Sequence, residues 1–398
     1  MTICLVCKKD SLVERLDLGL QPVSNRFLAS PTESEFLHPL GLSICEACGL
    51  VQLYNAVPSD EVRPRVDWIT YNEPEVHLSS FVDRIAQLPK LPENSLVLGV
   101  SRYDEPMLRR LQSAFSMRGG ILAPLEDLGI TAPGAGIETL QQQLTSFPAT
   151  SLTEKYGRID MVVARYVLEH AHDPVELLAN LMRIAAPGGY VVVEVPDASQ
   201  SLHKGDYSTL WEEHTCYFTP TTLRGCLHAA GLNPIFIQTF ADSALLAVCR
   251  RPKASCSLVS SSTSEVADEI ERAHRFLRGF RPRMKAEQAF FAEESRQGGI
   301  ALLGAGHATC AFVNLFQLGE FIDLIIDDNP KKQGLFMPGS RLPIRSTEAL
   351  RSEQIRLCLM NVRTEVEDAV LSRNQAFVDR GGEIASLCAD SRYSRRVA

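Results

Sequence analysis

A carboxylate and an imidazole stand side by side just past the middle of the chain, as Glu213 and His214. Aromatic residues flank the pair, with Trp211 before it and Tyr217 and Phe218 after it. An imidazole next to a carboxylate can remove a proton from a carbon acid, because the carboxylate raises the basicity of the ring. A structural loop whose aromatic residues fill the core and whose charges face water would have the same composition. The pair alone leaves both interpretations open.

Four of the eleven cysteines are distinguished by their spacing. They form two Cys-x-x-Cys pairs separated by residues 8–44, Cys4 with Cys7 and Cys45 with Cys48. Two such pairs supply the four thiolates of a tetrahedral zinc site, and sites made only of thiolates are closed and structural. The odd number of cysteines, in a long chain without an export signal, argues against disulfides. We therefore predict a zinc ion that folds about sixty residues and takes no part in chemistry.

The composition is that of a globular protein that works on small molecules. Of the 398 residues, 45% are hydrophobic and 22% are charged, which provides cores for two or three domains. The formal net charge of −8 argues against nucleic acid or an anionic membrane as the main partner. We see no signal peptide and no apolar run of the roughly 20 residues that span a bilayer. We therefore expect a cytoplasmic protein.

Apolar runs of strand length alternate with amphipathic runs of helix length over much of the chain. Such an alternation predicts α/β domains with parallel, buried strands. The runs that predict strands are 95–100, 156–164, 190–195, 235–237, 244–248, 299–303 and 324–327. The runs that predict helices are 75–88, 106–115, 175–184, 222–230 and 265–296.

Three separated regions carry longer motifs. The front has Leu-Gly-x-x-Pro-x-x-Asn-x-Phe at 18–27 and Cys-x-x-Cys-Gly-Leu-Val-Gln-Leu at 45–53. The middle has Val-Leu-Glu-His-x-x-Asp-Pro at 167–174 and Glu-His-x-x-Tyr-Phe at 213–218. The back has Lys-Gln-Gly-x-x-x-Pro-Gly-x-x-x-Pro-Ile at 332–344. In this order, the motifs resemble those of the three-domain sugar C-methyltransferases, which use S-adenosylmethionine to methylate nucleotide-linked keto-deoxysugars.

The resemblance implies a fold class and a domain order. The fold is α/β, with an N-terminal zinc-ribbon-like module over residues 1–60. A class I methyltransferase (Rossmann-like) domain follows over 61–254, and a second Rossmann-like domain over 265–398. The cofactors implied are a structural zinc ion and S-adenosylmethionine, and the partner is a nucleotide-sugar.

The resemblance also implies roles in catalysis. His214 would remove the proton next to the sugar keto group, while Glu213 would orient the ring or share its charge. A neutral imidazole suffices for this step once the enolate oxygen is stabilised. Tyr71 is the nearest match to a family active-site tyrosine, although it could equally pack a domain junction.

The donor-binding turn departs from the family pattern. The family carries an acidic residue, two spaced glycines and Asn-Asp-Gly after the first strand, whereas this turn has the single glycine Gly99. Ala123 stands where a glutamate would bind the ribose. The residues placed to contact S-adenosylmethionine are Gly99, Ser101, Asp104 and Tyr166. These departures leave an alternative: a scaffold that does not use this donor and acts as a nucleotide- or sugar-binding protein or as another proton-transfer enzyme.

Two further pairs have more than one interpretation. Glu169 and His170 could be mistaken for a catalytic pair, and we interpret them as lining or capping the end of a strand. Gly304 and Gly306 precede Asp327 by about 20 residues, which is the Rossmann spacing for a ribose-binding acid. A sharp turn without a ligand would explain these glycines equally well.

Overall fold

The structure is a computed structural model that describes residues 3–66, 68–69, 73, 75–89, 92–131, 136–240, 244–251, 263–352 and 354–395. The chain forms two compact units. The first unit consists of residues 1–16, 41–204 and 213–277, and the second of residues 17–40, 205–212 and 278–398. Tyr71, predicted to belong to the active site, lies outside the described residues.

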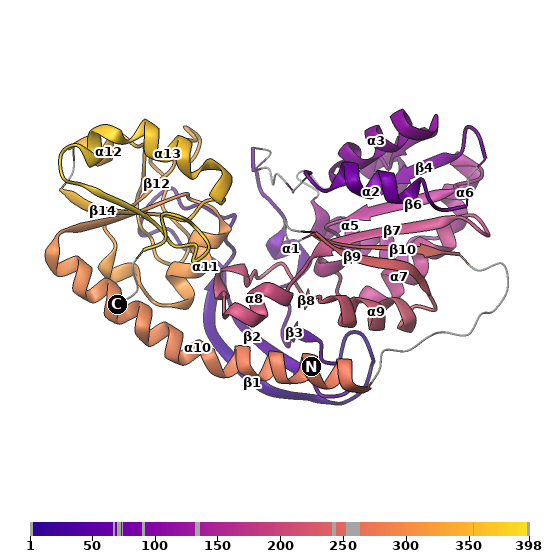
Figure 1. Cartoon of the computed structure of the whole chain (residues 1–398), viewed down its shortest axis with the longest axis horizontal. Helices are drawn as coiled ribbons and strands as arrows, with labels where there is room; N and C mark the ends of the chain where they lie inside the picture. The colour runs from indigo at the N-terminus through magenta and orange to yellow at the C-terminus, as the bar shows by residue number, and fades with distance from the viewer. Residues whose placement is uncertain are drawn as a thin grey trace. The chain divides into compact units, whose positions relative to one another are not determined.

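A six-stranded sheet forms the centre of the first unit, in the order β5-β4-β6-β7-β10-β9 (Figure 1). Its first four strands run parallel, and β10 and β9 are each antiparallel to their neighbour. The strands are β4 (Leu96–Gly99), β5 (Arg118–Ile121), β6 (Met161–Arg165), β7 (Tyr190–Pro196), β9 (Pro234–Thr239) and β10 (Ala244–Arg250). Runs rich in valine and leucine form the central strands, because such side chains suit a strand buried on both faces.

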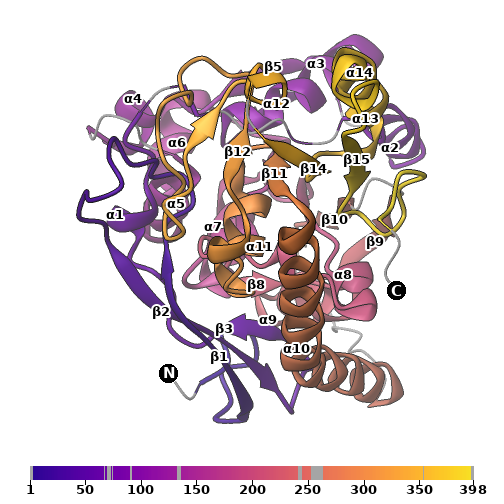
Figure 2. The same ribbon diagram turned by 90° about the vertical axis from the view of Figure 1, so that its left-hand side faces the viewer.

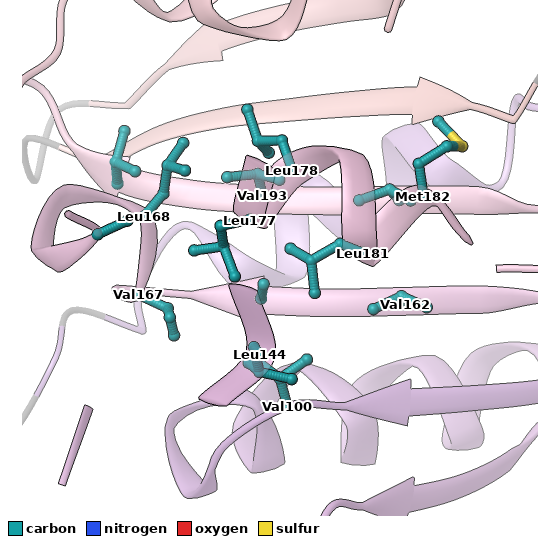
Figure 3. Packing of buried hydrophobic residues seen from close by; sticks show 14 of the residues in the cluster. Val100, Leu144, Val162, Val167, Leu168, Leu177, Leu178, Leu181, Met182 and Val193 are labelled. Carbon is teal, nitrogen blue, oxygen red and sulfur yellow. The ribbon is translucent and has the colours of Figure 1, made fainter. Parts of the chain in front are cut away.

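Helices cover both faces of this sheet (Figure 1). Val97 and Val163 pack with residues of α2 and α3 on one face, whereas Leu98, Val162 and Val193 pack with α5, α7 and α9 on the other. Adjacent residues of a strand thus enter opposite cores, as the alternation of side chains along a strand requires. Figure 3 shows the second core, where leucines of α7 lie over β6 and β7. The helices are α1 (Ser59–Val62), α2 (Leu78–Ile85), α3 (Glu105–Phe115), α4 (Pro124–Leu128), α5 (Ile137–Ser146), α6 (Ala149–Tyr156), α7 (Pro174–Ile184), α8 (Ser199–Lys204) and α9 (Pro220–Ala229).

A second, four-stranded sheet has the order β1-β2-β3-β8. β3 pairs antiparallel with both β2 and β8. The strands are β1 (Leu12–Pro22), β2 (Leu37–Cys45), β3 (Val51–Leu53) and β8 (Cys216–Tyr217). β8 is remote in sequence from the other three strands, and this pairing ties the middle of the chain to its front.

The second unit has a five-stranded parallel sheet in the order β13-β12-β11-β14-β15 (Figure 2). Its strands are β11 (Gly299–Leu303), β12 (Leu324–Ile326), β13 (Ile344–Arg345), β14 (Ile355–Met360) and β15 (Glu383–Ser386). Its shorter helices are α11 (His307–Leu315), α12 (Ala349–Ser352), α13 (Glu367–Arg373) and α14 (Gln375–Val378). The long helix α10 (Thr263–Gln297) begins in the first unit and ends in the second. Both units therefore have the predicted α/β architecture.

One predicted strand begins later than the sequence suggested. The run 156–164 is extended only from Met161, because Tyr156 is the last residue of α6. Gly157 ends that helix with φ 73°, a left-handed conformation that glycine adopts without a steric penalty.

Candidate active site

The four predicted zinc ligands lie together in the first unit. The Sγ atoms of Cys4 and Cys48 are 3.7 Å apart, those of Cys7 and Cys45 are 3.5 Å apart, and all four lie within 4.8 Å of one another. A zinc ion with bonds of about 2.3 Å requires thiolates about 3.8 Å apart at the corners of a tetrahedron. The cluster therefore fits a structural zinc ion. Gly49, with φ 76°, shapes the turn after the second pair.

His214 lies in a loop that hydrogen bonds fix to a turn earlier in the chain. The next residue, Thr215, donates its amide to the Glu169 carbonyl at 2.7 Å and its hydroxyl to the Ala171 carbonyl at 2.6 Å. Beyond it, β8 pairs with β3, with Tyr217 opposite Val51. The loop therefore has anchors on two sides, and His214 is held beside the turn that follows β6.

This anchoring creates a cluster of Glu169, His170 and His214. One potential ligand atom from each of the three side chains lies within 4.8 Å of those of the other two. The rings of His170 and His214 meet edge to face, with centroids 4.7 Å apart and planes at 88°. His214 is partly exposed, whereas Glu169 and His170 are buried. The cluster can thus meet a ligand through His214 and keep two further polar groups behind it.

Burial sets the charge state of the cluster. It raises the pKa of the Glu169 carboxyl well above its usual value, and the carboxylates of Glu73 and Glu194 raise it further. Burial lowers the pKa of His170 to about 3, against a hydrogen bond with the Glu213 backbone that favours the charged ring. Burial therefore favours the protonated form of Glu169 and the neutral form of His170.

The aromatic residues around the Glu-His pair have different positions. The Tyr217 ring lies 6.3 Å from the His214 ring. Phe218 is fully buried in the core that α7 and α9 share. Trp211 belongs to the second unit, where its ring stacks on His307 with centroids 4.0 Å apart. Tyr217 thus lies near His214, and Phe218 fits the structural interpretation of the loop.

The residues predicted to bind the donor lie at the carboxyl ends of β4 and β6. Asp104 is completely buried and accepts the amides of Ser101 and Arg165, each at 2.8 Å. Gly99 leaves room for this carboxylate, since a Cβ there would lie 2.8 Å from the Asp104 Cβ. Tyr166 has φ 55°, a strained conformation that is common at ligand sites. These contacts give Asp104 and Gly99 a structural role, and their contact with a donor stays a prediction.

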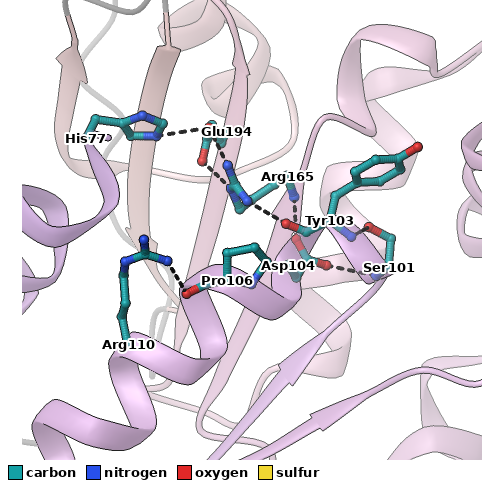
Figure 4. Close-up of polar contacts among 8 residues, drawn as sticks. All are labelled: His77, Ser101, Tyr103, Asp104, Pro106, Arg110, Arg165 and Glu194. Atoms are coloured by element: carbon teal, nitrogen blue, oxygen red, sulfur yellow. Dashed lines mark hydrogen bonds and ion pairs between the residues drawn. The ribbon is translucent and has the colours of Figure 1, made fainter. Parts of the chain in front are cut away.

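An ion network crosses the same edge of the sheet (Figure 4). Arg165 donates Nε to Glu194 Oε2 at 2.5 Å and a second nitrogen to Oε1 at 3.1 Å, and His77 Nε2 lies 3.1 Å from Oε1. A third nitrogen of Arg165 donates to the Tyr103 carbonyl. The Arg165 side chain is 1% exposed and that of Glu194 is not exposed at all. No local pattern indicates this network, because its members come from four segments far apart in the chain.

The charges at this edge fit S-adenosylmethionine in one respect and differ in another. The carboxylates of Glu73 and Glu194 both act on Tyr166, opposed by the guanidinium of Arg165, and a carboxylate beyond the one that pairs with Arg165 favours a cationic sulfonium ligand. After β5, at the position where the family has a ribose-binding glutamate, this chain has Ala123, whose side chain carries no carboxyl group. The nearby Asp127 accepts the Ala123 amide and the Tyr156 hydroxyl, each at 2.7 Å, and pairs with Lys155. The carboxylate at this place therefore makes hydrogen bonds within the protein, in contrast to the ribose-binding glutamate of the family.

The turn at Gly304 and Gly306 in the second unit is held by hydrogen bonds with two neighbouring side chains. Asp327 accepts the Ala305 amide at 2.9 Å and Lys332 Nζ at 3.0 Å. Lys332 also donates to the Ala305 carbonyl at 2.7 Å. The acid at the Rossmann spacing therefore stabilises the turn itself, which favours the interpretation of a sharp turn without a nucleotide.

Three family models match consecutive parts of the chain. One described as "Putative zinc binding domain" matches residues 4–62, one described as "Methyltransferase domain" matches 71–235, and one described as "C-methyltransferase C-terminal domain" matches 251–387. The curated C-methyltransferase NovU of Streptomyces niveus is 24% identical to this chain, over 95% of this chain and 93% of its own length.

Solved structures show weaker likeness. An O-methyltransferase family protein from Burkholderia thailandensis is 15% identical, with a TM-score of 0.32 over 44% of this chain and 56% of its own. A SAM-dependent methyltransferase from Aquifex aeolicus is 13% identical, with a TM-score of 0.29 over 44% of this chain and 93% of its own.

The six-stranded sheet, its helices and the matched central model define an S-adenosylmethionine-dependent methyltransferase of class I fold. The three matched models occur in the order of one family, and the curated relative spans them all. The chain belongs to the three-domain C-methyltransferases. Among the described residues, no helix is both long enough and apolar enough to cross a membrane.

Proposed function

We propose that this protein transfers a methyl group from S-adenosylmethionine to a carbon atom of a nucleotide-linked keto-deoxysugar, with His214 as the general base. The observation that carries the proposal is the position of His214. It is a partly exposed imidazole, held beside buried polar groups after a strand of a class I methyltransferase sheet. The motif similarity to the sugar C-methyltransferases supports the substrate class.

The chemistry follows from the residues. A carbon next to a keto group is acidic enough for a neutral imidazole, provided that the oxygen is stabilised as its charge develops. His214 takes the proton, and Glu213, the preceding residue, orients the ring or shares its charge. Tyr71 is assigned to the same site from the motif similarity alone. Bound S-adenosylmethionine supplies an electrophilic methyl group for the carbon that has lost its proton.

The test uses the full chain with a panel of nucleotide-linked keto-deoxysugars and S-adenosylmethionine. We expect one sugar to gain a methyl group by mass spectrometry. His214→Gln should abolish the product while the zinc content and the melting temperature stay unchanged. His203→Gln, a matched change at an exposed histidine of α8, should retain activity.

Calorimetry separates the donor from the base. S-adenosylmethionine should bind wild type and His214→Gln alike when the sugar is present. If it binds neither, the methyl-transfer part of the proposal is wrong. Turnover of a sugar without methylation would then favour the alternative, another proton-transfer enzyme, for which the replaced ribose contact at Ala123 is the motivating observation.

A further inference from the structure

The carboxyl group of Glu169 has no structural explanation. Its side chain is 2% exposed, and neither carboxyl oxygen has a hydrogen-bond partner on another residue in the described part of the chain. A carboxyl group buried without a partner on another residue is desolvated, and its own backbone amide compensates only in part, which leaves a cost in free energy. Proteins retain such groups mainly where a catalytic role, a water or an ion completes them.

The spacing of the cluster indicates which kind of ligand atom could form a hydrogen bond with the Glu169 carboxyl group. The potential ligand atoms of Glu169, His170 and His214 all lie within 4.8 Å of one another. Three atoms no farther apart than this can all lie about 2.8 Å from one ligand atom, which is an ordinary hydrogen-bond length to oxygen. The three side chains can therefore surround one oxygen atom of a ligand.

The three side chains of the cluster differ in their tendency to hold a proton, and these tendencies complement one another. Burial favours the protonated form of Glu169 and the neutral form of His170. His214 is the partly exposed member and can take up a proton. One buried acid and one accessible base thus lie within a few ångströms of each other. Glu213, the carboxylate adjacent in sequence, is not part of the described cluster.

We propose that Glu169 is the general acid of this site, giving its proton to the keto oxygen of the sugar while His214 takes a proton from the adjacent carbon. The inference rests on the proposed function and adds a catalytic residue to it. The C–H bond breaks and its electron pair forms the carbon–carbon double bond of an enol. The π pair of the carbonyl takes the Glu169 proton and forms an O–H bond. Glu169 ends as a carboxylate and His214 as an imidazolium.

Charge balance favours this assignment. If His214 acted alone, the negative charge beside the imidazolium would be carried by an enolate oxygen, which is a far stronger base than a carboxylate. A proton from Glu169 leaves the sugar neutral, and the two charges that remain are opposite and lie close together on the protein. Charges in a poorly solvated site are tolerated when they are paired in this way. The neutral His170 adds no third charge.

The experiment measures enolisation without the methyl donor. The full chain is incubated in deuterated water with the panel of nucleotide-linked keto-deoxysugars, and incorporation of deuterium next to the keto group is followed by NMR. Glu169→Gln keeps the size and polarity of the side chain but cannot give a proton. Its exchange rate should fall about 100-fold or more, the usual contribution of a general acid. Glu269→Gln, a matched change at a buried glutamate of α10, should leave the rate unchanged.

A pH profile distinguishes an acid from a structural residue. The wild-type rate should fall as the pH rises through the pKa of Glu169, whereas Glu169→Gln should lack this fall. The titratable groups that face Glu169 are His170, His214, Glu73, Glu194 and Cys216. All of them remain in the variant, so a fall that persists would belong to one of them and would overturn the inference.

The remaining outcomes separate this inference from the proposed function. If His214→Gln abolishes exchange and Glu169→Gln stays within threefold of wild type, Glu169 is not the acid and the base assignment stands. If wild type exchanges no sugar of the panel, both fail. Metal analysis gives an independent check: one zinc per chain is expected, and a second metal that disappears in Glu169→Gln would identify the cluster as a metal site and refute its role as an acid.

Discussion

The buried pair of Arg165 and Glu194 makes a quantitative prediction. Its two hydrogen bonds are 2.5 and 3.1 Å long, and neither side chain is more than 1% exposed. Glu194→Gln removes the negative charge that pairs with the buried guanidinium of Arg165. Breaking a buried pair in this way costs about 3–5 kcal/mol. For a unit of this size, that corresponds to a fall of roughly 10 °C in the melting temperature of the first unit.

A double-mutant cycle tests the physical cause. Arg165→Met alone should destabilise by a similar amount, since it leaves Glu194 with His77 as its only described charged partner. The double variant Arg165→Met with Glu194→Gln should be considerably more stable than the sum of the two single changes predicts, because it leaves neither charge buried without its partner. Urea unfolding is monitored by circular dichroism, whose signal does not depend on the tryptophans, and gives the free energy of unfolding of the first unit.

The dependence on pH provides a check on the same pair. Burial alone would raise the pKa of Glu194, but hydrogen bonds from His77 and Arg165 overcome it and lower the pKa below its ordinary value. A lowered carboxyl pKa contributes stability above the unfolded-state pKa, and this contribution is lost as the pH falls through the folded-state pKa. The deficit of Glu194→Gln should therefore be complete at pH 7 and shrink in acid. A deficit under 1 kcal/mol at pH 7 would refute the reasoning.

Three further predictions concern other parts of the first unit. Cys45→Ser should lower the zinc content from one ion per chain to none, measured by metal analysis, and expose residues 4–62 to limited proteolysis, because structural zinc contributes folding free energy directly. Burial raises the pKa of Asp104 to about 7, so the folded state binds more protons than the unfolded state between about pH 4 and 7. Wild type should lose stability across that range as the pH rises, and unfolding curves of Asp104→Asn should show a flatter dependence. Gly99→Ala should destabilise by about 1–3 kcal/mol in thermal unfolding, since its Cβ would lie 2.8 Å from the Asp104 Cβ and 2.9 Å from Leu108 Cδ1.

Local sequence patterns predicted which helices and strands occur better than they predicted where each one begins and ends. The helix expected over 106–115 is α3, and the strand expected over 190–195 is β7, because valine-rich runs and amphipathic spacing report directly on burial. The strand expected from residue 156 failed at its start, where the last turn of α6 and Gly157 precede the apolar run. Such limits depend on caps and turns, which a hydrophobic pattern does not reveal.

The site was predictable only in part, for a related reason. His214 could be singled out from its motif, and the four cysteines from their spacing. Glu169 and His170 were visible as a pair, but their meeting with His214 depends on the hydrogen bonds of Thr215 to backbone carbonyls more than forty residues away in sequence. Backbone contacts of this kind leave no trace in residue type. The carboxylate nearest in sequence, Glu213, was therefore the natural choice as partner.

The pairing of β3 with β8 has a consequence for how metal dependence should be interpreted. β3 follows the second cysteine pair directly, and β8 begins two residues after His214. Gln52 of β3 also contacts the first cysteine pair. Its side-chain oxygen lies 2.8 Å from the amide of Leu5, from which it accepts a hydrogen bond, and Leu5 lies between the two cysteines of that pair. A chelator would thus inhibit the enzyme from a distance, by releasing the loop that holds His214. Inhibition by metal removal would then resemble that of a metalloenzyme, although the zinc ligands lie outside the proposed site.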